Sequence, residues 1–189
     1  MSDNGLKELQ RVRRVSDMMV TAHCYLGEHY LRLYILTDVM IFICSILLCV
    51  LAFVDRETLL NYLGQYYSYI IGIFSVATLI FAYASSKFDW KVKAVEHKNA
   101  SQKYFEIKKE CDALEKEISE GKTIDMNTVI RKHETCSNML IKIPEDLFLK
   151  CKKHHLLKVE ISKRLTDHPF TSIPLYKIKS WIKANVIKK

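Results

Sequence analysis

The chain has 189 residues, 49% of them hydrophobic and 26% charged, and carries a formal net charge of +8. Its six cysteines show no paired spacing and its five glycines form no glycine-rich phosphate loop, which argues against a disulfide framework and a nucleotide-hydrolysing enzyme. The sequence also lacks a nucleophile elbow and a His-x-x-x-His pair, so we expect neither catalytic residues nor a cofactor.

Residues 1–34 predict an amphipathic helix on the cytoplasmic side of a membrane. Mostly apolar residues recur there at alternating steps of three and four, the spacing of a coiled-coil seam: Val12, Val15, Met19, Ala22, Leu26, His29 and Leu33. We interpret His29 as a packed structural residue of this seam, because a proton relay is the rarer role for such a histidine.

Two stretches without charged side chains follow, residues 39–54 and 58–86. A charge at the centre of a membrane-spanning helix costs ~2.5–3.5 kcal/mol, so long uncharged apolar runs are typical of such helices. The pattern predicts transmembrane helices over 35–54 and 66–86, joined by a short external loop over 55–65. Two buried helices of a soluble domain are the alternative, but a soluble core rarely needs so long an uncharged run.

Few polar or small residues lie within these two segments. Ser68 and Gly72 are four residues apart, a spacing that lets helices approach closely, and Ser75 lies near the same side. We expect a packing or pore-lining face formed by Ser68, Gly72, Ser75, Ser45 and Asp38. For Asp38, an interfacial position at the helix start is favoured over an ion-gating role.

The basic residues near the spans indicate the orientation. The loop between them holds only Arg56, whereas Arg32 precedes the first span and five lysines follow the second: Lys87, Lys91, Lys93, Lys98 and Lys103. Both termini are therefore expected in the cytoplasm.

Residues 87–119 predict a second cytoplasmic helix with a coiled-coil-like seam. Its seam positions are His97, Ala100, Tyr104, Ile107, Cys111, Leu114 and Ile118. Because a membrane hairpin makes the flanking helices antiparallel, the predicted fold is an all-α membrane protein whose transmembrane hairpin continues into an antiparallel cytoplasmic stalk. The two seams face each other or a neighbouring subunit.

Residues 123–189 predict a smaller helical region, with helices over about 125–140, 145–164 and 174–189. From Lys150 onward there are eleven Lys or Arg against two acids. The last helix is expected to contact a membrane surface or an anion through Lys177, Lys179, Trp181, Lys183 and Lys188. A helix packed on its own domain is the second interpretation, and direct nucleic-acid binding is the least favoured. Cysteines and histidines are also present here, but Cys136, Cys151, His154 and His155 lack the close cysteine pair of a zinc site.

Two short stretches carry a family resemblance that covers roughly residues 10–120. Ala-His-Cys-Tyr-Leu at 22–26 and His-Lys-Asn-Ala-Ser-Gln-Lys-Tyr at 97–104, on either side of the two spans, resemble the pattern of the SLATT family of bacterial two-transmembrane effectors. The resemblance implies a pore-forming toxin of antiviral defence, held silent until a neighbouring sensor is triggered. That sensor is a nucleotide second-messenger synthase or a retron reverse transcriptase with its noncoding RNA. A chain of this size with a basic helical extension is most similar to the retron-associated members.

The sequence and the resemblance together predict a homo-oligomer in the bacterial inner membrane that permeabilises or depolarises it and causes abortive infection. A membrane-anchored scaffold, recruiting cytoplasmic partners through the stalk and the basic tail, is the alternative from a different functional class. A small transporter or channel subunit is the third possibility, but it requires more polar groups within the spans than the sequence contains.

Overall fold

A computed structural model describes the chain apart from residues 1–2, 54–63, 65, 121–126 and 186–189. Within the described ranges the chain is helical and contains no strand. Its elements are α1 (Asp3–Phe53), α3 (Tyr66–Phe88), α4 (Trp90–Ser119), α5 (Asn127–Met139), α6 (Glu145–Asp167) and α7 (Ile173–Asn185). The all-α class predicted from the sequence is confirmed. Apart from Gly64, the predicted external loop over 55–65 lies outside the described residues.

The polar segment at the N-terminus and the first apolar segment belong to one helix. α1 continues for 51 residues without interruption, and no proline occurs between Asp3 and Phe53. A proline there would remove a backbone hydrogen bond and kink the helix. A movement of the N-terminal half of α1 can therefore be transmitted directly to its apolar half.

The second apolar helix is separated from the following polar helix by a single residue. Asp89 has a left-handed backbone conformation, with φ 47° and ψ 39°, and ends the hydrogen-bonded continuity between α3 and α4. The aromatic rings of Phe88 and Trp90 stack beside this break at a centroid distance of 5.3 Å. The break lies close to the predicted boundary between the segments 66–86 and 87–119, at a residue type that tolerates the left-handed region better than most.

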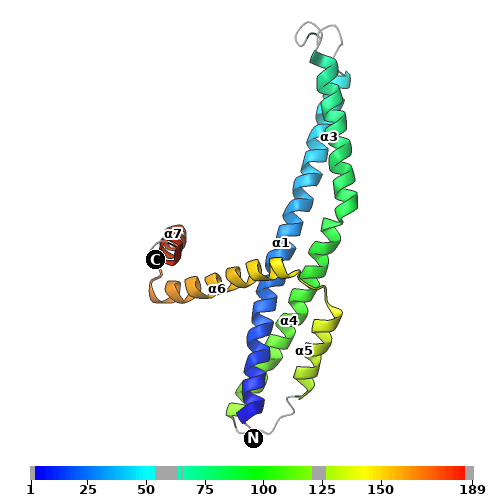
Figure 1. The fold of residues 1–189 in the computed structure, drawn as a ribbon. Coiled ribbons are helices and arrows are strands. Elements are labelled where there is room, and N and C mark those ends of the chain that lie inside the picture. The colour runs from blue at the N-terminus through cyan, green and yellow to red at the C-terminus, as the bar shows by residue number, and fades with distance from the viewer. Residues whose placement is uncertain (1–2, 54–63, 65, 121–126, 186–189) are drawn as a thin grey trace.

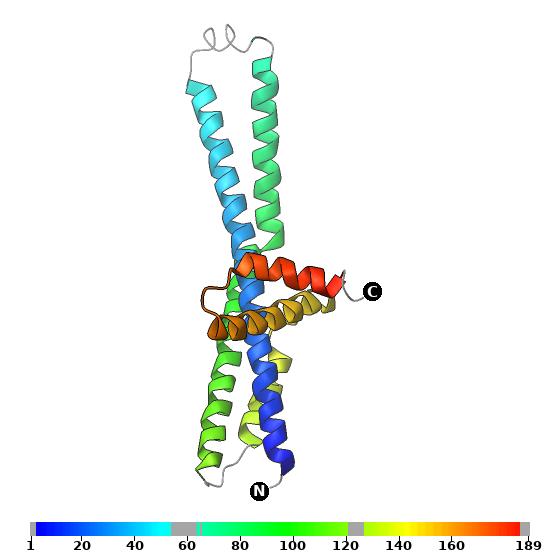
Figure 2. The ribbon, with the colours of Figure 1, turned by 90° about the vertical axis from the view of Figure 1, so that its left-hand side faces the viewer.

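The helices are arranged as a long rod, formed by α1, α3, α4 and α5, with a lateral arm, formed by α6 and α7 (Figures 1 and 2). α1 lies beside α4 in one half of the rod and beside α3 in the other, and α5 packs on α4 and α1 near the N-terminal end. α6 crosses α1 and projects away from the rod. α7 lies on the side of α6 that is nearer to α3, as both views show.

Two apolar clusters hold the polar half of the rod together. We call the first the stalk cluster; α1, α4 and α5 contribute its buried residues, which are Leu9, Val12, Tyr104, Ile107, Cys111 and Val129. The second, the crossing cluster, consists of Ala22, Leu26 and Cys151, where α6 meets α1. Burying a leucine side chain such as Leu26 contributes roughly 1.5–3 kcal/mol, so the crossing cluster attaches the arm to the rod.

Candidate functional site

Two histidines from opposite helices meet inside the stalk. His23 of α1 is 0% exposed and His97 of α4 is 3% exposed, and their Nδ1 atoms lie 2.8 Å apart. One ring must donate its Nδ1 proton while the other accepts with a bare Nδ1. This hydrogen bond is therefore compatible with two neutral rings or with one neutral and one charged ring, but not with two charged rings.

Aromatic rings enclose this pair on both sides. Tyr30 stacks on His97 at a centroid distance of 5.5 Å, and Tyr104 stacks on His23 at 5.6 Å. His133 of α5 contacts the edge of the Tyr104 ring at 6.1 Å. The stack thus joins α1, α4 and α5 by rings that adopt few rotamers, which fixes the register of the three helices.

The environment of the pair keeps both rings neutral. Burial, and to a smaller extent the neighbouring His97, lowers the pKa of His23 from its ordinary value of 6.5 to about 4. Burial likewise lowers the pKa of His97. The Nε2 atom of His23 is buried and has no hydrogen-bond partner among the described residues, and the same is true of the Ser16 hydroxyl seven residues earlier on α1. A proton added here therefore meets an unfavourable site with little to solvate it.

Ion pairs between the helices surround the buried stack. Lys108 of α4 bonds Asp17 of α1 at 2.6 Å, and Arg13 of α1 bonds Asp112 of α4. The hydrogen bond from Arg13 to Asp112 raises the pKa of the guanidinium. These pairs are partly exposed, so each adds little stability on its own and chiefly fixes the register of α1 on α4.

The seam predicted on α4 is buried for most of its length. His97, Ala100, Tyr104, Ile107 and Cys111 are buried, and Leu114 and Ile118 are half-buried. On α1, Val12 is buried while Val15, Met19 and Leu33 are half-buried.

The α1 seam requires a correction at two places. His29 is exposed, and His23 occupies the buried position against His97. Ala22 and Leu26 are buried against Cys151 of α6. The physical reason is that α1 has two covered sides, and a single heptad seam describes only one of them.

A second pattern in the sequence marks the side of α1 that faces α4. Ser16, His23 and Tyr30 recur at intervals of seven, with Gly27 between the last two. A Cβ added to Gly27 would lie 3.5 Å from the Ala94 carbonyl oxygen and 3.6 Å from the His97 Cβ, so the helices approach closely here. Because these positions are polar or small, hydrophobic periodicity alone does not reveal them.

The polar residues predicted for the apolar helices do not converge within one chain. The Ser45 hydroxyl donates to the Ile41 carbonyl oxygen at 2.8 Å, and Ser75 is half-buried. Asp38, Ser68 and Gly72 are exposed, and a Cβ added to Gly72 would meet nothing within 4 Å. The face that carries Ser68 and Gly72 is thus open and does not pack α3 on α1.

α1 and α3 meet through other residues. The Tyr67 hydroxyl donates to the Leu51 carbonyl oxygen at 3.2 Å. Toward the inner end of the contact, Thr37 and Cys44 of α1 are buried. Small side chains at these two positions allow the helices to approach closely.

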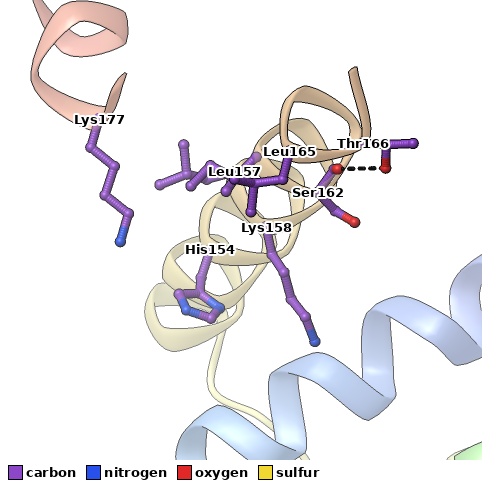
Figure 3. A pocket seen from close by; sticks show the side chains of 8 residues that line it. His154, Leu157, Lys158, Ser162, Leu165, Thr166 and Lys177 are labelled. Atoms are coloured by element: carbon purple, nitrogen blue, oxygen red, sulfur yellow. Dashed lines mark hydrogen bonds between the residues drawn. The ribbon is translucent and has the colours of Figure 1, made fainter. Parts of the chain in front are cut away.

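The arm carries the predicted cationic residues. α6 and α7 are linked by the Tyr176 hydroxyl, which donates to Glu160 Oε1 at 2.7 Å, and they enclose an open cavity of about 500 Å³. Figure 3 shows Lys177 of α7 on one side of this cavity and His154 and Lys158 of α6 on the other. Trp181 is exposed, as are Lys179 and Lys183, while Lys188 lies outside the described residues.

The residues considered for zinc lie in different parts of the structure. Cys151 belongs to the crossing cluster and its Sγ lies 3.9 Å from the Ala22 carbonyl oxygen, whereas Cys136 packs against the stalk cluster. Among the residues that the structure describes, no group of three or more His, Cys, Asp or Glu side chains is arranged to hold a metal ion.

Two helical segments of this chain, Gly5–Phe53 in α1 and Tyr66–Ser119 over α3 and α4, contain stretches that are long and apolar enough to cross a membrane. No family model matches the sequence, and no match was found among curated proteins or solved structures.

Proposed function

We propose that this chain is a membrane effector of an antiviral defence system, which oligomerises and permeabilises or depolarises the inner membrane when it is released from control. The observation that carries the membrane assignment is the exposure of the apolar helices. Only 11% of the most apolar stretch of α1 is buried. In the α3–α4 segment, none of the most apolar stretch is buried. Side chains such as Phe42, Ile73 and Leu79 are 66–70% exposed and require an apolar surrounding.

Assembly of several copies follows from the size of the membrane part. Two helices cannot enclose an aqueous path, so a pore requires polar or small faces from several chains. The open face around Ser68 and Gly72 is available for such contacts, because no part of the same chain covers Gly72. We therefore assign this face to contacts between subunits instead of contacts within the hairpin.

Control of the effector is proposed to act through the stalk. α1 joins the buried His23 to the first apolar segment in one helix, whereas Asp89 separates the second apolar helix, α3, from α4. A regulator that favours one packing of the stalk over another would thereby favour one arrangement of the spans. The resemblance to SLATT effectors implies that this regulator is encoded nearby, as a second-messenger synthase or as a reverse transcriptase with its noncoding RNA.

Replacing the spans tests the pore against the scaffold. Residues 35–54 and 66–86 are exchanged for unrelated membrane anchors of the same length, and growth is followed after induction in bacteria. A pore former loses its toxicity because the span faces form the pore, even though the chain still reaches the membrane. Toxicity that survives the exchange would contradict the pore and support a scaffold acting through its stalk and arm.

A further inference from the structure

The last described helix, α7, has one apolar side that points away from α6. Leu175, Ile178 and Ile182 fall within about 60° of one another at 100° per residue, and Trp181 borders them. They are 68%, 57%, 40% and 61% exposed in the order Leu175, Ile178, Ile182, Trp181. The half-buried Tyr176 and Ser180 lie on the opposite side of α7, where Tyr176 bonds Glu160 of α6.

Lysines border this apolar side on both edges. Lys177 lies on one edge, where it also lines the cavity between α7 and α6, and Lys179 and Lys183 lie on the other; all three are exposed. An apolar strip bordered by lysines, with a tryptophan beside it, is the composition of helices that lie in the plane of an anionic membrane surface. A contact surface for a folded protein would not need positive charge along both borders.

The position of α7 along the rod agrees with such a surface. α6 crosses α1 at Leu26, nine residues before Ile35, which corresponds to about 14 Å along the helix axis. α7 lies on the side of α6 nearer to α3, close to the level at which α3 ends, as Figures 1 and 2 show. The apolar side of α7, which faces away from α6, therefore reaches the level at which the first span begins.

Other cations mark the same level of the rod. Lys91 lies over the Tyr34 ring at 5.7 Å and Lys93 over the Tyr30 ring at 5.9 Å, directly after the end of α3. Basic residues and aromatic rings concentrate where a spanning helix leaves the bilayer on its cytoplasmic side. The lysines of α7 extend this positive zone sideways from the rod.

We propose that α7 lies in the plane of the inner membrane surface, with Leu175, Ile178, Ile182 and Trp181 inserted among anionic lipid headgroups and Lys177, Lys179 and Lys183 paired with them. This inference rests on the membrane insertion of the spans in the proposed function. It adds a second membrane contact that holds the arm, and through the crossing cluster the stalk, at a fixed height below the bilayer.

Tryptophan quenching by lipid tests the proposal on the full-length chain. The Trp90→Phe variant keeps Trp181 as its only tryptophan and is reconstituted into vesicles of phosphatidylethanolamine and phosphatidylglycerol that contain brominated acyl chains. We expect Trp181 to be quenched by the brominated lipid. Each lysine near the surface contributes roughly fivefold to surface binding, so changing Lys177, Lys179 and Lys183 together to Gln should at least halve this quenching.

The matched control removes the same charge from the stalk. Changing the exposed Lys103, Lys109 and Lys116 of α4 together to Gln in the same background should leave the quenching unchanged. Trp181 that is not quenched in a chain that floats with the vesicles would overturn the proposal for α7 alone. Emission that responds to added RNA and not to brominated lipid would overturn it in favour of a nucleic acid. A chain that does not float with the vesicles would contradict the membrane insertion itself.

Discussion

The buried histidine pair is the feature at the scale of single residues that most constrains the stalk. His23 and His97 share one hydrogen bond in a site that disfavours protonation, so the chain loses a favourable contact whenever both rings are charged. The unfolded chain binds a proton at His23 near pH 6.5, whereas the folded chain binds it only near pH 4. The contribution of His23 to the unfolding free energy is therefore fully present above pH 6.5 and is lost as the pH falls toward 4.

Lowering the pH should destabilise the stalk in this window. The shift for His23 corresponds to about 3 kcal/mol of unfolding free energy between pH 6.5 and pH 4. Denaturant unfolding of the chain in detergent micelles, repeated across this range, measures it. His23→Gln should flatten the dependence, and His29→Gln, at an exposed position of the same helix, should leave it unchanged. An equal slope in both variants would show that His23 is not the titrating group.

The cysteines provide a second prediction for individual side chains. Burial raises the pKa of Cys111 to about 11, which leaves its thiolate roughly 100-fold less populated than for an ordinary thiol, while Cys24 is exposed. In variants that retain one cysteine each, maleimide labelling at pH 7.5 should be at least 100-fold slower at Cys111 than at Cys24. Similar rates would mean that α1 does not cover this part of α4.

Part of this site follows from the sequence and part does not. The α4 seam from His97 to Cys111 is predicted by its heptad spacing, because α4 buries one continuous side. The partner of His97 is not predicted. In that region of α1 two sides are covered: His23 packs against α4, while the preceding residue, Ala22, packs against α6. Separating the two sides requires knowing that α6 returns to α1, and that contact between residues 22 and 151 leaves no local pattern.

At the scale of elements, the open side of α3 is the feature that links the fold to the proposed assembly. Gly72 faces no part of its own chain, so a larger side chain there disturbs only what lies outside the monomer. Close helix contacts in membranes depend on small residues at such positions.

Gly72→Leu should leave the monomer intact and weaken assembly and toxicity. Crosslinking in membranes and growth after induction measure the two effects. Ala52→Leu, which adds bulk at an exposed position of α1, serves as the control and should change neither. Unchanged crosslinking and toxicity in Gly72→Leu would remove this face from the assembly.

The break between α3 and α4 gives a further prediction for the elements. The left-handed conformation of Asp89 costs a residue with a Cβ roughly 1–2 kcal/mol, and β-branched side chains tolerate it least. Asp89→Gly should preserve or raise the unfolding free energy, and Asp89→Val should lower it by about that amount, in denaturant unfolding of the micelle-bound chain. The reverse order would contradict the left-handed break.

At the scale of the whole molecule, helix class and the two apolar segments follow from hydropathy alone, because long uncharged runs permit few structures. The direction of the arm does not follow, since it depends on the small crossing cluster of Ala22, Leu26 and Cys151. In the functions proposed above, the rod and the arm meet the membrane at two levels, through the spans and through α7.

The central claim is that this chain depolarises the membrane in which it resides, and membrane potential is the direct test. A voltage-sensitive dye is followed in bacteria induced to express the chain alone, and then with its genomic neighbours under phage challenge. We predict depolarisation that precedes growth arrest, suppression of it by the neighbours, and its return on infection. A potential that stays intact in every condition, although the chain is confirmed in the membrane, would contradict the account.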